Sequence, residues 1–429
     1  MVGGGPAGST VAALLARKGL SVTLVERDRH PRFHIGESLL PMNMPIVERL
    51  GLSGELQAIG LKKLGADFPA DNERGYNVFS FDRCLNPTWP FAYQVKREEF
   101  DLMLFRHAGR SGARTLEGAQ AGRVAFDKDG ATVEITVDGV THSHRTRYLI
   151  DASGRDTLLG GQMRLKRRNP EHQSAALFAH FRNVVRRPGE HEGNVSVYRF
   201  DHGWIWMIPL RDGLMSVGAV CSPDYLKRRD GGSREDFLMR TLMGIPDVAK
   251  RMEKAEIAGN LHATGNYSYS CRQISGPRWM MVGDAYAFVD PIFSTGVYLA
   301  MHSAELAADV VEQVLREPRR ERALQRRYLR EVRKGIDSLS WFIFRFNTPA
   351  IAWLFRNPRN MLRVEEAMIS MLAGDVFRDG GVKWRLQFFK LLYYVTSVIH
   401  WRESFAAWMR RRRQISMEFA GGTTRQDPA

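Results

Sequence analysis

The sequence contains little cysteine: three residues in 429, at positions 84, 221 and 271. None of them forms a CxxC pair. This usage disfavours a disulfide framework and a cysteine-based metal site, and we expect no bound metal. It also fits the reducing environment of a cytoplasm.

Long hydrophobic runs are missing as well. The longest uncharged apolar stretches, such as Leu391–Ile399, are far shorter than the roughly 20 residues that span a bilayer. Residues Met1–Gly5 show neither the basic part nor the apolar part of a secretion signal. We therefore expect a cytoplasmic protein that is at most peripheral to a membrane.

Negative charge is scarce relative to positive charge. The chain has 62 Lys and Arg against 47 Asp and Glu, which gives a formal net charge of +15. Such an excess suits nucleic acid, an anionic membrane surface or an acidic protein partner. Because no nucleic-acid recognition motif accompanies the charge, we expect no nucleic acid partner.

The apolar pattern predicts mixed α and β structure in a definite order. The first half combines helices with alternating strands, a second β-rich block follows, and the last hundred residues are helical, aromatic and basic. The expected elements are a helix Gly8–Lys18, a strand Ser21–Glu26, a helix Arg97–Gly109, strands within 121–150 and 174–222, and a long helix 296–316.

The chain opens on a glycine-rich motif of the form GxGxxG. Its residues are Gly3, Gly4, Gly5, Pro6, Ala7 and Gly8, directly before the first predicted helix. Such glycines permit a tight turn and close approach of the backbone to a pyrophosphate, which the helix N-terminus then attracts. Glu26, beside Arg27, ends the following strand eighteen residues after Gly8, where an acid accepts hydrogen bonds from ribose hydroxyls. A glycine-rich turn beside a surface glutamate is the plainer alternative.

The motif normally follows a central β-strand, of which only Met1-Val2 is present. Loss of such a strand exposes its neighbours' edges and weakens the sheet. We therefore expect the natural product to begin several residues earlier.

A second motif, Gly283-Asp284, ends a predicted strand and resembles the GD motif of FAD-dependent monooxygenases, where the Asp meets the ribityl chain. The run Asp290–Val297 then opens a helix whose N–H groups can hold an anion. Arg97 and the segment Asp151–Arg155 match two further positions of that fold.

The segment Trp204-Ile205-Trp206-Met207-Ile208-Pro209 is a full WxWxIP motif. Together with Gly36-Glu37-Ser38 and Asp290–Gly296, it resembles the flavin-dependent halogenases, in the branch that acts on phenols and pyrroles. The resemblance covers about residues 1–360. Packing within a strand is the plainer explanation of the two tryptophans, since Trp favours strands.

The resemblance implies an α/β fold: a Rossmann-like FAD-binding domain, an inserted β-sheet substrate domain and a helical C-terminal region. We expect the FAD-binding domain at 1–170 and 260–320, the β-rich domain at 171–259, the helical region at 321–420 and a disordered tail at 421–429.

Several site residues follow from the same resemblance. Trp204 and Trp206 would keep the flavin hydroperoxide from reacting directly with an organic substrate, and halide would bind at Thr295 and Gly296. The implied FAD contacts are Gly3, Gly5, Pro6, Ala7, Gly8, Glu26, Arg27, Glu37, Ser38, Arg97, Asp284, Pro291, Gly296 and Val297.

The family also carries an essential lysine in a KxGA run. Lys63-Leu64-Gly65-Ala66 matches it, so Lys63 is the candidate, with Lys62 as the alternative and two solvated surface lysines as the plainer interpretation. The resemblance implies reduced FAD from a separate reductase, oxygen, and chloride or bromide. A shielded lysine can then hold hypohalous acid, and burial lowers its pKa.

Phe293 stands where tryptophan halogenases place an acidic residue, so a phenol or pyrrole is the expected substrate, free or tethered to an acyl carrier protein. Carrier proteins are acidic and would suit the basic surface. The sequence assigns no general base. A hydroxylase or reductase of the same fold, and a flavin- or carrier-binding protein without turnover, remain alternatives.

Near the C-terminus, Trp384, Phe388, Leu391, Val395, Val398 and Phe405 recur at helical spacing before Arg410–Arg413. This pattern predicts a helix packed on the catalytic body with a solvated basic end. The alternative is weak contact with a membrane surface or a carrier protein.

Overall fold

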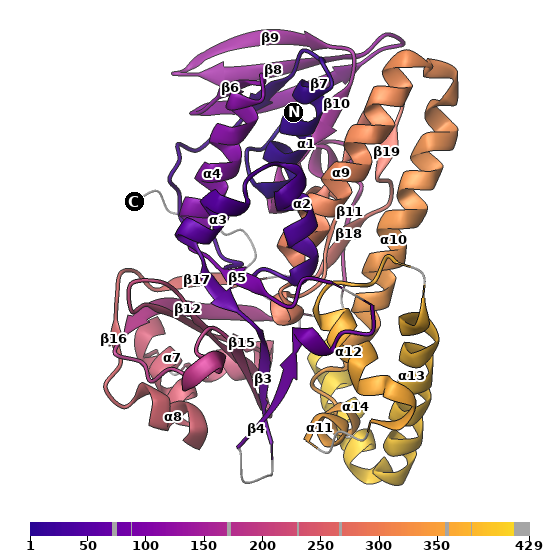
Figure 1. The fold of residues 1–429 in the computed structure, drawn as a ribbon. Helices are drawn as coiled ribbons and strands as arrows, with labels where there is room; N and C mark the ends of the chain where they lie inside the picture. Colours follow the sequence, from indigo (N-terminus) through magenta and orange to yellow (C-terminus); the bar gives the residue numbers. More distant parts are fainter. Residues whose placement is uncertain are drawn as a thin grey trace.

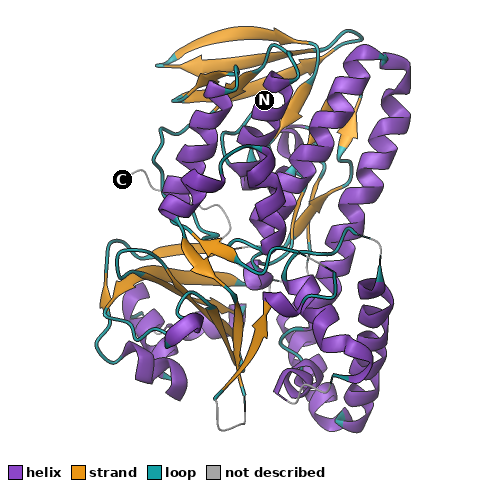
Figure 2. Cartoon of the chain, in the orientation of Figure 1, coloured by secondary structure: helices purple, strands orange, loops and turns teal. Residues whose placement is uncertain are grey.

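The structure is a computed structural model that describes residues 1–70, 75–86, 88–169, 173–229, 231–265, 268–356, 360–378 and 380–415. The predicted tail at 421–429 lies outside these residues, as do the side chains of Arg410–Arg413. Two main sheets, several smaller ones and a group of C-terminal helices dominate the described part of the chain (Figures 1 and 2).

The first sheet carries the N-terminus in its middle. Met1–Gly3 lies between β1 (Thr23–Val25) and β10 (Leu149–Asp151), and bonds to both: the Val2 N–H donates to the Ile150 carbonyl and the Gly3 N–H to the Val25 carbonyl. Outward from these, β1 pairs with β6 (Arg114–Leu116) and β10 with β20 (Trp279–Met281), both in parallel. The short N-terminal segment therefore occupies the position expected for the central strand.

Three helices pack on this sheet. The predicted helix after the glycine-rich motif is α1 (Pro6–Arg17), and it contacts both α4 (Arg97–Arg110) and α9 (Thr295–Arg316). Small buried side chains on α1, such as Ala12 and Ala13, permit this close packing. A separate antiparallel sheet of β7 (Ala119–Phe126), β8 (Ala131–Val137) and β9 (Val140–Thr146) lies at the top of Figure 1.

The second sheet is built around four antiparallel strands. These are β12 (Ala175–Arg182), β13 (Val195–Phe200), β14 (Gly203–Pro209) and β15 (Met215–Cys221). At one edge β12 pairs with β16 (Glu256–Ile257) and β17 (His262–Gly265), and at the other β13 pairs with β3 (Gly65–Pro69), followed by β4 (Tyr76–Ser80). Three strands of this sheet, β3, β4 and β17, thus come from the segments assigned to the FAD-binding domain, and the domain boundaries stay a prediction.

Side-chain alternation gives this sheet two apolar faces. On β12, Leu177, Ala179 and Phe181 pack with α7 (Arg234–Met243) and α8 (Pro246–Met252). The intervening Phe178 belongs to the other face, which we call the tryptophan face because Trp204 and Trp206 lie on it. Both faces are covered within the described chain, as the burial of nearly every residue in β14 and β15 requires.

The C-terminal region is helical, as predicted. It consists of α10 (Glu321–Arg345), α11 (Pro349–Arg356), α12 (Val364–Leu372), α13 (Gly381–Ile399) and α14 (Trp401–Ile415). In Figure 1, α10 runs along the side of the molecule and the last four helices gather at the lower right. In the part of the chain that is described, no helix combines the length and apolar character needed to cross a membrane.

The predicted α/β fold class, with its Rossmann-like sheet, β-sheet region and C-terminal helices, is confirmed. One packing prediction is correct only in part. Helix α13 packs on the body through Val382, Leu386 and Phe389, and Phe388 of the predicted stripe is partly buried there. The stripe residues Trp384, Leu391, Val395 and Val398 are exposed.

Candidate active site

At two positions the glycine-rich turn packs so closely against neighbouring backbone that there is no room for a side chain. A Cβ on Gly3, whose φ is +100°, would lie 2.3 Å from the Ala152 carbonyl oxygen, and one on Gly8 would lie 1.8 Å from the Gly3 carbonyl oxygen. A Cβ on Gly5 would meet only an Arg32 nitrogen, at 3.6 Å. Gly3 and Gly8 are therefore required by packing, while Gly5 borders open space.

That open space lies at the start of α1, whose first turn has neither a capping side chain nor an acidic residue. Its N–H groups and positive dipole end remain available to an anion. A dinucleotide pyrophosphate suits this cradle, and the FAD contacts of Gly3, Gly5 and Gly8 stay a prediction. The residues present therefore suit FAD.

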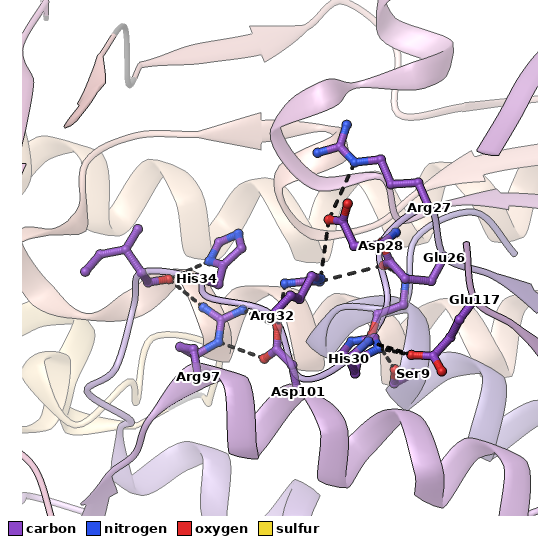
Figure 3. A network of polar contacts seen from close by, with 12 residues as sticks. Ser9, Glu26, Arg27, Asp28, His30, Arg32, His34, Arg97, Asp101 and Glu117 are labelled. Carbon is purple, nitrogen blue, oxygen red and sulfur yellow. Dashed lines mark hydrogen bonds and ion pairs between the residues drawn. The ribbon is translucent and has the colours of Figure 1, made fainter. Parts of the chain in front are cut away.

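Glu26 is buried at the end of β1 and organises the same turn. Its Oε2 accepts from the Gly4 N–H at 2.7 Å and its Oε1 from the Asp28 N–H at 3.0 Å. Arg32 lies between acids, with Nη2 3.7 Å from Glu26 Oε2 and Nη1 3.3 Å from Asp101 Oδ2 (Figure 3). Glu26 is thus fixed at the position predicted to meet a ribose.

Arg97 is buried, and its guanidinium group donates hydrogen bonds to other residues of the protein. Nε and Nη2 donate to the two oxygens of Asp101, at 2.8 and 3.0 Å, and Nη1 donates to the Ile35 carbonyl at 2.7 Å (Figure 3). Burial opposes the charge on Asp101, but the Arg97 guanidinium outweighs it and holds the pKa of Asp101 below its ordinary value. Arg97 thereby fixes the turn at Gly36, whose φ is +104°.

The two sequence motifs predicted to share one cofactor site do meet. Gly283 begins a short helix, η6 (Gly283–Ala285), and a Cβ there would lie 3.4 Å from Cβ of Ala7 and 3.0 Å from Cβ of Ala300. Burial raises the pKa of Asp284 to about 6, against the opposing charges of Arg155 and Arg97. The carboxylate therefore lies within electrostatic reach of both arginines.

The arginine predicted beside the ribose makes a surface contact. Arg27 is partly exposed, and its Nη1 lies 2.5 Å from Asp156 Oδ2 in η3 (Gly154–Asp156). The helix η3 packs against η6, so Arg27 borders the region where the two motifs join. Its contact with FAD stays a prediction.

The start of α9 presents a second uncapped helix end. It follows η7 (Pro291–Phe293) and Ser294, which adopts a left-handed conformation, and no side chain caps it. Thr295 and Val297 are buried, and Val297 Cγ2 would lie 4.0 Å from a Cβ on Gly36. The Gly36–Ser38 segment thus adjoins the predicted halide-binding residues Thr295 and Gly296, whose role stays a prediction.

Lys63 is almost completely buried, with 1% of its surface exposed, at the end of β2 (Leu61–Lys63). Its Nζ donates to Ser38 Oγ at 2.9 Å and to the Leu39 carbonyl at 3.1 Å. Burial lowers the pKa of Lys63 to about 7. Lys62, the alternative candidate, is exposed and lies over the Phe91 ring, so Lys63 alone of the two has a shielded amine.

Sequence reasoning missed a partner of the Glu37 carboxylate. Glu37 Oε1 lies 2.7 Å from His180 Nε2 on β12, and Oε2 has no hydrogen-bond partner within the described chain. Burial lowers the pKa of His180, but Glu37 outweighs this effect and raises it overall. His180 lies two residues after Phe178 on β12 and therefore shares the tryptophan face. No local pattern in the sequence links it to a residue 143 positions earlier.

The two tryptophans of the WxWxIP motif lie side by side on β14. Their ring centroids are 5.7 Å apart, and Trp206 Nε1 donates to Ser216 Oγ at 3.1 Å. A Cβ on Gly218 would fall 2.3 Å from the Trp206 ring, so the neighbouring strand leaves room for the indole. Strand packing and a functional role are therefore compatible for these residues.

One apolar cluster connects the predicted catalytic residues. The Lys63 amine lies 5.3 Å from the centroid of the Phe81 ring. Phe81 belongs to the same buried cluster as Trp204, Trp206 and Phe293, and Phe293 stands two residues before Thr295. Phe81 thus links the lysine to an extended apolar cluster that also contains the tryptophan pair and the residues just before α9.

Comparison with known proteins gives a consistent result. The tryptophan halogenase family profile matches residues 1–88 and 80–350. A tryptophan 2-halogenase of Chondromyces crocatus is 38% identical over 324 residues, which are 73% of this chain and 61% of that protein. The chain thus spans less than two thirds of that relative's length.

Two further similarities concern pyrrole halogenation and structure. A 1H-pyrrole-2-carbonyl-[peptidyl-carrier protein] brominase of Pseudoalteromonas luteoviolacea is 34% identical over 322 residues, 73% of this chain and 77% of that protein. The solved structure of the flavin-dependent brominase Bmp2 aligns with a TM-score of 0.81 and 28% identity, covering 92% of this chain and 97% of that one. The chain therefore belongs to the flavin-dependent halogenases, oxidoreductases that use FAD, oxygen and halide.

Proposed function

We propose that this chain halogenates an electron-rich aromatic ring, a phenol or a pyrrole, with Lys63 as its catalytic residue. The observation that carries the proposal is the burial of the Lys63 amine beside the apolar cluster that contains Trp204 and Trp206. An ordinary surface lysine stays charged and solvated, whereas this amine is shielded and has a pKa of about 7.

Bound reduced FAD, reacting with oxygen, supplies the oxidising equivalents that convert halide into hypohalous acid. In our proposal the turn Gly3–Gly8, Glu26 and Asp284 hold the cofactor. The uncapped start of α9 at Thr295 and Gly296 attracts the halide, because a helix N-terminus favours an anion. Trp204 and Trp206 separate the flavin side from the organic substrate.

The Lys63 amine is suited to bind the oxidant, hypohalous acid. Two acceptors, Ser38 Oγ and the Leu39 carbonyl, engage two of the three N–H bonds of the ammonium and fix its direction. The third N–H can donate to hypohalous acid. In the neutral form, accessible because burial lowers the pKa, the amine lone pair can instead attack the halogen of hypohalous acid, so that the halogen–oxygen bond breaks and the released hydroxide leaves with an amine proton as water. Exclusion of water around Lys63 protects either species from loss.

The substrate proposal rests on Phe293 and on charge. Phe293 is an apolar residue at a position where an acid would favour tryptophan, and it lies in the same cluster as the tryptophan pair. A carrier-bound substrate is attractive because the chain has a net charge of +15 and carrier proteins are acidic. A separate flavin reductase is the proposed source of reduced FAD.

Matched methionine variants of the two adjacent lysines test this proposal. Lys63→Met keeps the length of the side chain but removes the amine, and Lys62→Met makes the same change at an exposed position. With a flavin reductase, chloride or bromide, and a panel of free and carrier-bound phenols and pyrroles, we expect Lys63→Met to lose about a hundredfold or more of halogenation, measured by mass spectrometry. Lys62→Met should retain it.

Binding of FAD, measured by fluorescence titration, should be unchanged in both variants. Halogenation by Lys63→Met at the wild-type rate would contradict the role of the lysine. Hydroxylated products formed without halide would show that the chain is a monooxygenase. Contact of the C-terminal helices with a membrane surface is a separate proposal that does not depend on this chemistry.

A further inference from the structure

Helix α13 has apolar side chains on opposite faces. Its inner face carries Val382, Leu386 and Phe389, which are buried in the cluster that also contains the tryptophan pair. Its outer face carries Trp384, Leu391, Val395 and Val398, at intervals of seven, four and three residues, all of them exposed. A helix that is apolar all round is expected to be covered on every side. The described chain covers only the inner face of α13.

Helix α14 adds a second exposed apolar stripe. Trp401, Phe405 and Trp408 follow one another at intervals of four and three residues, and each is exposed. The Phe405 and Trp408 rings stack with centroids 5.7 Å apart, so the stripe is continuous. Helices α13 and α14 contact each other at the lower right of Figure 1, at the far end of the molecule from the nucleotide-binding sheet. We call the two stripes together the outer surface.

The segment that forms the outer surface is rich in basic residues. Residues 381–415 contain one acidic residue, Glu403, and eight basic residues: Lys383, Arg385, Lys390, Arg402 and Arg410–Arg413. Some of these cations lie against the aromatic rings. The Arg385 guanidinium lies 4.2 Å from the Trp384 ring centroid and that of Arg402 lies 5.6 Å from Trp401. Aliphatic and indole side chains are thus bordered by cations rather than by carboxylates.

This composition selects among the partners that could cover such a surface. A second copy of the chain would bring eight cations against eight cations with one carboxylate on each side, which opposes association. An acidic carrier protein would match the charge but not the large exposed aliphatic and indole side chains, since contacts of that transient kind are small and polar. Helices that lie in a membrane interface combine Trp and aliphatic residues with Lys and Arg.

We propose that the outer surface of α13 and α14 docks on an anionic membrane surface. The apolar stripes enter the boundary between headgroups and acyl chains, and the flanking cations lie against lipid phosphates. Docking of this kind requires no membrane-spanning helix, in accord with the lengths and compositions of the helices in the described ranges. The inner face of α13 stays packed on the body throughout.

Vesicle sedimentation of the full chain tests the proposal. The probes are vesicles of phosphatidylcholine alone and of phosphatidylcholine mixed with phosphatidylglycerol. We expect sedimentation with the mixed vesicles, weakening as salt is added, and little with the neutral ones. The triple variant Leu391→Ser, Val395→Ser, Val398→Ser should bind about tenfold or more weakly, because three apolar side chains no longer leave water.

A second triple variant provides the matched control. Val140→Ser, Val185→Ser and Met243→Ser replace apolar residues elsewhere that are 46% to 58% exposed, against 49% to 72% for the three on α13. This control should sediment like the wild type. Circular dichroism and FAD titration establish that both variants fold.

Three outcomes would overturn the proposal. One is failure of the wild type to sediment with mixed vesicles, and another is equal binding by the two triple variants. The third is a concentration-dependent dimer that the α13 variant abolishes while vesicle binding is absent, which would assign the outer surface to a second copy.

Discussion

Lys63 places an amine where burial opposes its charge, and the consequence can be measured without catalysis. Its pKa falls from 10.5 in the unfolded chain to about 7 in the folded protein. At pH values between these two pKa values, the Lys63 side chain carries a proton in the unfolded state that it lacks in the folded state. Stability therefore rises with pH across this window, by up to about 1.4 kcal/mol per pH unit from this group. Below pH 7 both states are protonated and the contribution is flat.

We predict that the free energy of unfolding of the wild type, minus that of Lys63→Met, increases with pH from about 7 to about 9.5. Titrations elsewhere cancel in this difference. The substitution leaves Ser38 Oγ and the Leu39 carbonyl without the lysine amine, which adds a constant offset but no pH dependence. Urea unfolding at several pH values measures both proteins. A difference that stays level over this range would show that Lys63 keeps its proton when buried.

At the scale of elements, two glycines of one turn have different roles. A Cβ on Gly8 would collide with the Gly3 carbonyl, so Gly8→Ala must separate α1 from the turn. A Cβ on Gly5 meets only the end of a flexible arginine and projects into the cradle proposed for the pyrophosphate. Gly8 is therefore required for the fold, whereas Gly5 keeps the proposed pyrophosphate cradle open.

We predict that Gly8→Ala lowers the melting temperature of the protein without FAD, with a loss of about 1–3 kcal/mol from overpacking. Gly5→Ala should leave that melting temperature within a degree or two of the wild type, yet weaken FAD binding about tenfold or more. Thermal unfolding and FAD titration of both variants separate the effects. Normal FAD affinity in a folded Gly5→Ala protein would place the pyrophosphate elsewhere.

Elements with a clear local period were predictable from the sequence. The helix expected at 296–316 is α9, at Thr295–Arg316, and β8 (Ala131–Val137) lies within the segment 121–150 where strands were expected. Their boundaries follow from side-chain periodicity and turn residues, which are local. Both faces of α13 are apolar, so periodicity alone does not tell which one packs inward, and the predicted stripe consists mainly of exposed residues, with Phe388 as the member that packs.

Site residues were predictable where a motif spans a few positions, and not where partners are distant. The glycine turn, the tryptophan pair and Lys63 each belong to short motifs. The Ser38–Lys63 bond joins residues 25 positions apart, and the Glu37–His180 bond joins residues 143 apart. Such pairs depend on how β2 and β12 pack against the Gly36–Ser38 segment, which no local pattern encodes.

At the scale of the whole molecule, the excess of positive charge has a consequence for substrate delivery. A net charge of +15 creates a field that attracts an acidic protein before any specific contact forms. Salt weakens this attraction, because the Debye length falls from about 10 Å at 0.1 M to about 3 Å at 1 M. A small neutral phenol or pyrrole gains nothing from the field.

We predict that kcat/KM for a substrate tethered to an acidic carrier protein falls about tenfold or more as salt rises from about 0.1 M to about 1 M. With the free form of the same ring, kcat/KM should change little. The assay contains no lipid, so the C-terminal helices do not bias it, and a saturating reductase keeps the supply of reduced FAD constant. Mass spectrometry of the halogenated carrier and of the free product gives both rates. Parallel salt dependence of the two would show that the charge of the chain does not recruit a carrier, and would leave the free ring as the substrate that the site favours.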